Sequence, residues 1–129
     1  MKIDFPGGKK VRAAYKDHII ETDQSPATGG EGLHPSPFDL FKASLGTCMG
    51  AYVMLFCEER NIPLDCVSID MQFEGDGTIE NVNTQINVDE RFPSKYYRAL
   101  VKATESCKVK RQLKSSPVFM TTVNPKADR

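Results

Sequence analysis

The sequence has no excess of charge of either sign. Lys plus Arg total 17 and Asp plus Glu total 17, so the formal net charge is zero. A neutral chain has no electrostatic attraction for nucleic acid or for an anionic membrane surface. We therefore expect no nucleic-acid partner.

Long hydrophobic runs are also missing. The first ten residues, MKIDFPGGKK, lack the apolar stretch of a secretory signal. The longest uncharged run covers residues 43–57, which is shorter than the roughly 20 residues that span a bilayer. We therefore expect a cytoplasmic protein with no membrane partner, in which the four cysteines are free thiols.

The spacing of cysteine and histidine does not indicate a metal site. No two cysteines have a C-x-x-C spacing, and His18 and His34 are far apart in the sequence. Since His34 precedes the segment that carries Cys48, a Cys–His hydrolase is one alternative, but no residue that would orient the imidazole can be identified.

The length fits one domain, residues 1–129, which is large enough for a core without disulfides. Three short N-terminal segments alternate between polar and apolar residues, and this pattern predicts strands. These segments are residues 2–5, 10–15 and 18–22. A loop rich in glycine and proline follows at residues 23–36.

A long helix is predicted at residues 37–60. Ser36 is a suitable N-cap, Pro37 fits the first helical position, and Asp39 completes a capping box. Pro63 marks the end of the helical pattern.

The second half of the sequence predicts a hairpin, a helix and a last strand. The hairpin is predicted at residues 66–74 and 78–90. The helix is predicted at residues 93–107 and continues or restarts at 108–114, and the last strand is predicted at residues 118–123. The predicted order is β-β-β-α-β-β-α-β, and the fold class is α+β.

The apolar residues of the long helix cover every face of it, and such a helix must be buried all round. One small sheet cannot cover all its sides. Gly46 and Gly50, four residues apart, would allow a second backbone to approach closely. We therefore expect a homodimer; the alternative is that the second helix and the N-terminal sheet provide the cover.

The four cysteines differ in their expected positions. Cys48 and Cys57 are half a turn apart in projection and point to opposite sides of the long helix. Cys107 lies on the inner face of the second helix, so its sulfur can meet that of Cys48 if the helices pack. A buried free cysteine is most often a small hydrophobe, and we expect this of Cys57 and Cys66.

Cys107 has a different environment from the others. It is followed by Lys108, Lys110 and Arg111, and nearby cations lower the pKa of a thiol. The alternative is an ordinary helix end, where solvated cations are also favoured.

Two sequence motifs, one around Cys48 and one around Cys107, resemble those of a known protein family. The segment SPFDLFKASLGTCMG, followed about sixty residues later by SCKVKRQL, resembles the OsmC/Ohr family of osmotically inducible and organic hydroperoxide resistance proteins. The family's first cysteine matches Cys48, and its Cys-x-Val-x-x-x-Leu stretch matches Cys107, Val109 and Leu113. The resemblance covers almost the whole chain.

The resemblance implies an OsmC-like fold, an intertwined homodimer with both cysteines at its interface, and a thiol-dependent peroxidase. In such an enzyme Cys48 is oxidised by a small organic hydroperoxide to a sulfenic acid, and Cys107 then forms a disulfide with it. A dithiol reductant restores both thiols. No cofactor is implied.

The sequence departs from the family pattern near the site. The family's peroxidases carry an N-terminal arginine oriented by an acid ten residues before the first cysteine. Here that place is Phe38, and Asp39, our candidate for the acid, follows it. Lys9, Lys10 and Arg12 are the candidate cations. A non-catalytic dimer that binds a small apolar or thiol-reactive ligand at its interface is therefore the alternative function.

Overall fold

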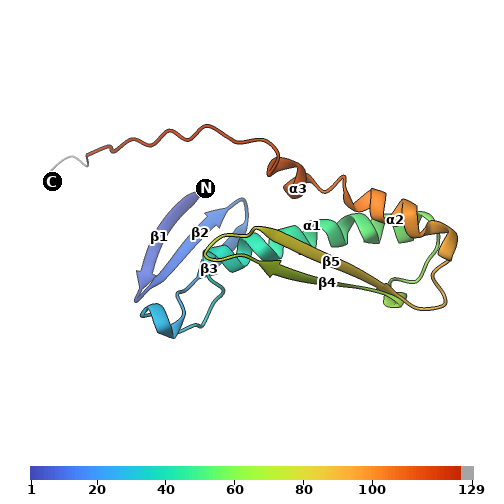
Figure 1. Cartoon of the computed structure of the whole chain (residues 1–129). Coiled ribbons are helices and arrows are strands. Elements are labelled where there is room, and N and C mark those ends of the chain that lie inside the picture. Colours follow the sequence, from blue (N-terminus) through green and yellow to red (C-terminus); the bar gives the residue numbers. More distant parts are fainter. Residues whose placement is uncertain (126–129) are drawn as a thin grey trace.

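The N-terminal part of the protein is an antiparallel sheet of three strands. The computed structural model describes residues 1–125. In it β1 (Lys2–Gly7), β2 (Lys10–Tyr15) and β3 (His18–Thr22) lie in the order β1-β2-β3 (Figure 1). The three predicted N-terminal strands are confirmed, and β1 extends two residues further than expected.

The loop after β3 is folded around one carboxylate. Asp23 is 1% exposed, and its side chain accepts hydrogen bonds from the backbone N–H groups of Gln24 at 2.7 Å, Glu31 at 3.3 Å and Leu33 at 3.2 Å. A short 3-10 turn, η1 (Pro26–Thr28), lies inside this loop. The loop therefore holds a defined shape as it leads into the long helix.

The long helix α1 runs over Pro37–Glu59, within one residue of the prediction. Its capping box is present. Ser36 Oγ accepts from the Asp39 N–H at 3.1 Å, and the Asp39 carboxylate accepts from the Ser36 N–H at 3.1 Å. These two bonds satisfy backbone donors that the first helical turn leaves free.

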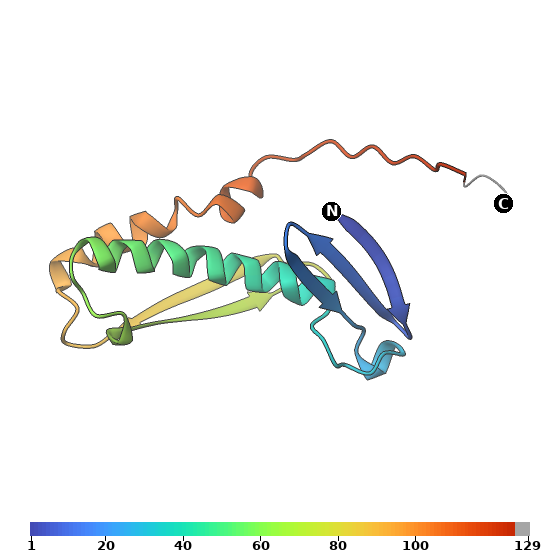
Figure 2. The same ribbon diagram turned by 180° about the vertical axis from the view of Figure 1, so that it is seen from behind.

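The core lies where α1 meets the second half of the chain. After a 3-10 turn, η2 (Leu64–Cys66), the antiparallel hairpin of β4 (Val67–Glu74) and β5 (Asn81–Val88) runs along α1 (Figure 2). The buried side chains form one cluster: Val53, Phe56, Cys57, Ile62, Cys66, Phe92 and Leu100.

The predicted second helix is divided in two. A 3-10 turn, η3 (Ser94–Tyr96), leads into α2 (Tyr97–Thr104), and after a break at residues 105–107 the chain restarts as α3 (Lys108–Gln112). Both α2 and α3 contact α1. Because of this break, Cys107 is the N-cap residue of α3.

The predicted last strand, residues 118–123, is not a strand in this chain. The segment is extended and leaves the body of the molecule (Figure 1). A strand needs a neighbour for its backbone hydrogen bonds, and no strand within residues 1–125 pairs with it. Its apolar side chains remain exposed; Phe119 is 86% and Met120 is 92% accessible.

The long helix is only partly covered by its own chain. Phe38, Met54 and Leu55 are each 40–49% exposed. By length and composition α1 would also suffice to cross a membrane, although the core helix of a soluble protein has the same properties. The single chain therefore leaves apolar surface on α1 without cover.

Candidate thiol site

The structure brings Cys48 and Cys107 together. Cys48 lies in the middle of α1 and is half-buried, whereas Cys107 precedes α3 and is fully buried. Each side chain shifts the pKa of the other, so the two sulfurs lie close together between α1 and the start of α3. The expectation that the two sulfurs meet agrees with this geometry, while their roles in a reaction stay a prediction.

Cys107 is the N-cap of α3. Its Sγ accepts a hydrogen bond from the Lys110 N–H at 3.5 Å, and its carbonyl oxygen accepts from the Arg111 N–H at 2.9 Å. Sulfur here takes the part that a hydroxyl or carboxylate oxygen takes at most helix starts. This arrangement fixes the Cys107 side chain at the junction of α1 and α3.

The surroundings favour the thiolate of Cys48. The Cys107 thiol and the backbone N–H groups of Val109 and Lys108, together with the positive charge of Arg111, hold the pKa of Cys48 below its ordinary value, although burial opposes this effect. Hydrogen bonds and opposite charges favour the charged form of a group. Cys48 is therefore the more nucleophilic thiol of the pair.

The surroundings of Cys107 favour its protonated form. Burial, followed by the hydrogen bond and the nearby charge of Cys48, raises the pKa of Cys107. The sequence-based expectation that cations would lower this pKa is therefore wrong. The positive charge of Arg111 lowers the pKa of Cys48 instead, whereas burial is the largest effect on Cys107 and raises its pKa.

Cys57 and Cys66 lie in the hydrophobic core, as predicted. They are 0% and 4% exposed. Burial and, next, the neighbouring Cys66 raise the pKa of Cys57. A buried thiol in apolar surroundings is chemically inert, so neither residue competes with Cys48.

Asp39 and the candidate cation Arg12 have other partners within the chain. The backbone and side chain of Ser36, and then the charge of Lys42, lower the pKa of Asp39. Arg12 donates two hydrogen bonds to the carboxylate of Asp4, at 2.9 and 2.7 Å. Asp39 is therefore placed as a helix cap, and its part in a reaction stays a prediction.

Lys10 and His34 each have a carboxylate partner. The Lys10 ammonium is 3.6 Å from the Glu31 carboxylate, and His34 Nε2 is 3.0 Å from Glu21. The Cys–His hydrolase is not supported, because His34 faces a carboxylate on β3. In residues 1–125 no group of three possible metal ligands is gathered.

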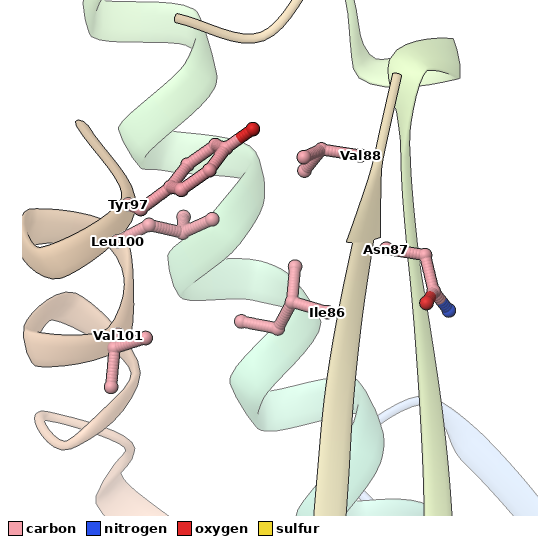
Figure 3. A pocket seen from close by; sticks show the side chains of 6 residues that line it. All are labelled: Ile86, Asn87, Val88, Tyr97, Leu100 and Val101. Carbon is pink, nitrogen blue, oxygen red and sulfur yellow. The ribbon is translucent and has the colours of Figure 1, made fainter. Parts of the chain in front are cut away.

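Two hollows border α2. One, of about 460 Å³, lies between α1 and α2 and is lined by Tyr52 and Leu55, which follow Cys48 on α1, and by Ser106, the neighbour of Cys107. The other, of about 420 Å³, lies between β5 and α2, and Figure 3 shows its mostly apolar walls. Neither Cys48 nor Cys107 lines either hollow, and the first includes sequence neighbours of both.

The sequence pattern left open whether the second helix continues or restarts after Cys107, and the structure shows that it restarts. The effect of the backbone N–H groups of α3 on Cys48 was not predicted. The polar sequence Glu105-Ser106 before Cys107 is a possible signal of the break, since serine and acidic residues are common at helix boundaries. The sequence alone could not show which sulfur the backbone N–H groups of α3 affect, because this depends on how α3 packs on α1.

The fold has relatives among solved structures. An osmotic stress induced and detoxification response protein of Psychrobacter arcticus 273-4 aligns with a TM-score of 0.72 and 19% identity, over 86% of this chain and 85% of the other. The organic hydroperoxide resistance protein OsmC of Legionella pneumophila aligns with a TM-score of 0.60 and 19% identity, over 88% and 87%.

Sequence comparisons agree with the fold. No curated protein matches the chain at a significant level. Residues 29–122, which include both Cys48 and Cys107, match the family described as OsmC-like protein. With most of its length matched and its fold shared with two solved relatives, the chain belongs to the OsmC-like protein family.

Proposed function

We propose that the protein is a thiol-dependent peroxidase that reduces organic hydroperoxides to alcohols. The observation that carries this proposal is the pairing of Cys48 on α1 with Cys107 at the start of α3, in which the pKa of Cys48 is lowered and that of Cys107 is raised. A peroxidatic thiol must be ionised to attack, and a resolving thiol beside it completes the cycle.

The reaction begins at the Cys48 sulfur. The thiolate attacks the distal oxygen of the hydroperoxide, a sulfur–oxygen bond forms and the O–O bond breaks. The alkoxide that leaves takes a proton and departs as the alcohol, while Cys48 becomes a sulfenic acid. Sulfur is thus oxidised by two electrons, and the peroxide is reduced by two.

Cys107 completes the oxidative half of the cycle. Its sulfur attacks the sulfenic sulfur of Cys48, a disulfide forms, and the hydroxyl leaves as water. A dithiol reductant then attacks the disulfide, passes through a mixed disulfide and is itself oxidised, which restores both thiols. These steps use only sulfur chemistry, and the proposal includes no cofactor.

The surface near the site favours an organic substrate. The hollow between α1 and α2 has apolar wall residues such as Tyr52, Leu55 and Ala103. The charged residues Glu59, Arg60 and Lys102 also line it. Apolar walls stabilise an alkyl group by removing it from water, and hydrogen peroxide lacks such a group. The name of the Legionella relative, an organic hydroperoxide resistance protein, supports the same substrate class.

The proposed working form is an intertwined homodimer in the cytoplasm. Three apolar surfaces of the single chain support a second copy. They are α1 at Phe38, Met54 and Leu55, the N-terminal sheet at Ile3, Phe5, Ile19 and Ile20, and the extended segment 118–123. A reducing compartment also suits a cycle that begins with free thiols.

The test is intact mass with peptide mapping after one equivalent of an organic hydroperoxide, with hydrogen peroxide in parallel. We expect rapid loss of two hydrogen atoms, mapped to Cys48–Cys107 and faster with the organic peroxide. Cys48→Ser should abolish the reaction, and Cys66→Ala is the matched control that should retain it. Peroxide consumption at the full rate by Cys48→Ser would overturn the proposal.

The alternative function, a non-catalytic dimer that binds an apolar or thiol-reactive ligand, is favoured by one observation. Arg12 is paired with Asp4, and Asp39 caps α1, so the arginine–acid pair implied by the family is not formed within the chain. Titration of the thiols separates the two functions. An ordinary thiol pKa near about 8.5 for both Cys48 and Cys107 would favour ligand binding.

A further inference from the structure

We propose that the hollow between α1 and α2 binds an alkyl carboxylate, the anion of a medium-chain fatty acid, and that Arg60 recognises the charged head group. This binding needs neither a thiol nor a peroxide, so it goes beyond the proposed peroxidase function and does not depend on it. Three features of the molecule support the site: the fixed guanidinium of Arg60, its free hydrogen-bond donors and the walls of the hollow.

The guanidinium of Arg60 is held in place by its own chain. Its central carbon lies 3.6 Å from the centre of the Phe56 ring and 5.3 Å from the centre of the Tyr96 ring. Its Nη1 donates a hydrogen bond to the carbonyl oxygen of Phe56 at 3.1 Å. An arginine stacked on aromatic rings keeps its planar set of donors in one orientation. A ligand would therefore meet a cation that is already ordered, which reduces the entropic cost of binding.

The donor edge of Arg60 that suits a carboxylate is free. Arginine can offer its Nε–H and an Nη–H side by side to the two oxygens of a carboxylate. Arg12 binds Asp4 through Nε and Nη2 at 2.9 and 2.7 Å, and Arg91 binds Asp89 through the same two nitrogens at 3.1 and 2.6 Å. Within residues 1–125 only Nη1 of Arg60 donates a hydrogen bond, and the side chain is 30% exposed. Its Nε and Nη2 therefore remain available to an external carboxylate.

The hollow places apolar walls next to this cation. Its volume of about 460 Å³ lies within the roughly 300–1,000 Å³ of small-molecule sites. Tyr52 and Leu55 on α1 and Ala103 on α2 supply apolar surface, and Arg60 lines the same hollow. At a rise of about 1.5 Å per residue, the stretch from Tyr52 to Arg60 covers roughly 12 Å. An alkyl chain that lies along these walls is removed from water.

The charges around the hollow favour an anion. Arg60 and Lys102 line it together with one acid, Glu59, so the cations outnumber the anion. The Glu59 carboxylate is 3.4 Å from Arg60 Nη1, but its side chain is 73% exposed, and such ion pairs contribute little. The helices α1 and α2 run antiparallel, so the start of α2 lies beside the end of α1 (Figures 1 and 2). The opposite dipole charges of these two helix ends largely cancel, which leaves the side chains to decide.

The experiment measures the affinity of the reduced full chain for decanoate by titration calorimetry, with decanol as the uncharged probe of equal chain length. Decanoate should bind more tightly than decanol. Each CH₂ group removed, in nonanoate and then octanoate, should weaken binding by roughly two- to fourfold. Arg60→Gln should weaken decanoate binding roughly tenfold, as expected for hydrogen bonds to a charged group, and should leave decanol binding unchanged.

Two further variants test the charges without removing the stacked side chain. Lys102→Gln should weaken decanoate binding by about two- to threefold, and Glu59→Gln should tighten it by a similar factor, because both side chains are exposed. The matched controls are Arg98→Gln and Glu58→Gln. They remove the same charges from exposed positions of α2 and α1 that do not line the hollow, and they should leave the affinity unchanged.

Equal losses of decanoate and decanol binding in Arg60→Gln would overturn the proposal, because Arg60 would then only support the packing of the helices. Decanoate binding that neither Arg60→Gln nor Lys102→Gln affects would also overturn it, since the ligand would then lie elsewhere, and so would a lack of binding by the unmodified chain. None of these results bears on the peroxidase function, which is tested separately by disulfide formation between Cys48 and Cys107.

Discussion

The thiols of Cys48 and Cys107 are close neighbours from two different helices, and each displaces the pKa of the other, that of Cys48 downward and that of Cys107 upward. Cys48 lies on a long rigid helix, whereas Cys107 caps a short one. The N–H groups at the start of the short helix favour negative charge on Cys48, and the depth of Cys107 keeps its proton in place. Cys48 is therefore the more reactive thiol of the pair in the reduced protein.

This order predicts selective alkylation. Because the pKa of Cys48 is lowered and those of Cys107 and Cys57 are raised, Cys48 is the first thiol to ionise as pH rises. Limiting iodoacetamide near neutral pH should modify Cys48 first, as measured by peptide mapping. Cys57 serves as the internal control, since it should react only after unfolding. Equal labelling of all four cysteines would contradict the ordering.

Replacing the second thiol should stop the cycle halfway. Cys107→Ser removes the proposed resolving sulfur beside Cys48 and keeps a hydroxyl in its place. We expect one organic hydroperoxide to be consumed per site, with the gain of one oxygen atom on Cys48 and capture by a dimedone reagent. Continued turnover with a dithiol should fall at least about tenfold. Unchanged turnover would show that Cys107 does not resolve the sulfenic acid.

Substitutions in the capping box can distinguish two roles of Asp39, capping α1 and orienting a cation at the thiol site. Ser36→Ala should lower the free energy of unfolding by about 1 kcal/mol, because one end of α1 loses a capping bond. If Asp39 only caps the helix, Asp39→Ala should also destabilise the protein while the pKa of Cys48 stays unchanged. Denaturant unfolding and thiol titration together measure both effects. A raised pKa of Cys48 in Asp39→Ala alone would give Asp39 a part in orienting a cation at the site.

The buried carboxylate of the loop should make the fold sensitive to acid. Burial opposes ionisation of Asp23, but the N–H groups of Gln24, Leu33 and Glu31 hold its pKa below the ordinary value on balance. Its stabilising contribution is therefore complete above the unfolded pKa, near about 4, and is lost as pH falls through the lower folded pKa.

Asp23→Asn should remove this acid-sensitive contribution. We expect Tm to fall by several degrees at pH 7 and by much less once the pH falls below the lowered folded pKa of Asp23, because the wild-type carboxylate is then protonated as well. Thermal unfolding at a series of pH values measures the difference. Asp17→Asn, in an exposed hairpin turn, is the control. A constant difference in Tm across the range would show that the charge on Asp23 does not matter.

The exposed C-terminal segment should contribute to association. Phe119 is 86% exposed within residues 118–123, and burial of such a side chain in a dimer would contribute on the order of 2 kcal/mol. Phe119→Asp should therefore weaken a dimer that sedimentation detects for the unmodified chain. Ser115→Asp, an exposed polar site, adds the same charge as a control. A wild-type chain that sediments as a monomer would refute the proposed homodimer.

Local sequence patterns determined most of the secondary structure. The capping box of Ser36 and Asp39 placed the start of α1 because its hydrogen bonds join residues three apart. The alternation of Val67, Ile69, Met71 and Phe73 predicted β4 because side chains on a strand change face at every residue. The motifs around Cys48 and Cys107 indicated the family and, with the helix faces, the meeting of the two thiols.

Only the tertiary structure decided which thiol gains the negative charge. The cations near Cys107 are its neighbours in the sequence, yet the backbone N–H groups of α3 and the charge of Arg111 bear on Cys48. Likewise the apolar pattern of residues 118–123 predicted a strand, but strand pairing needs a partner that the described part of the chain does not supply. A pKa and a sheet both depend on contacts between distant residues, which periodicity along the sequence does not encode.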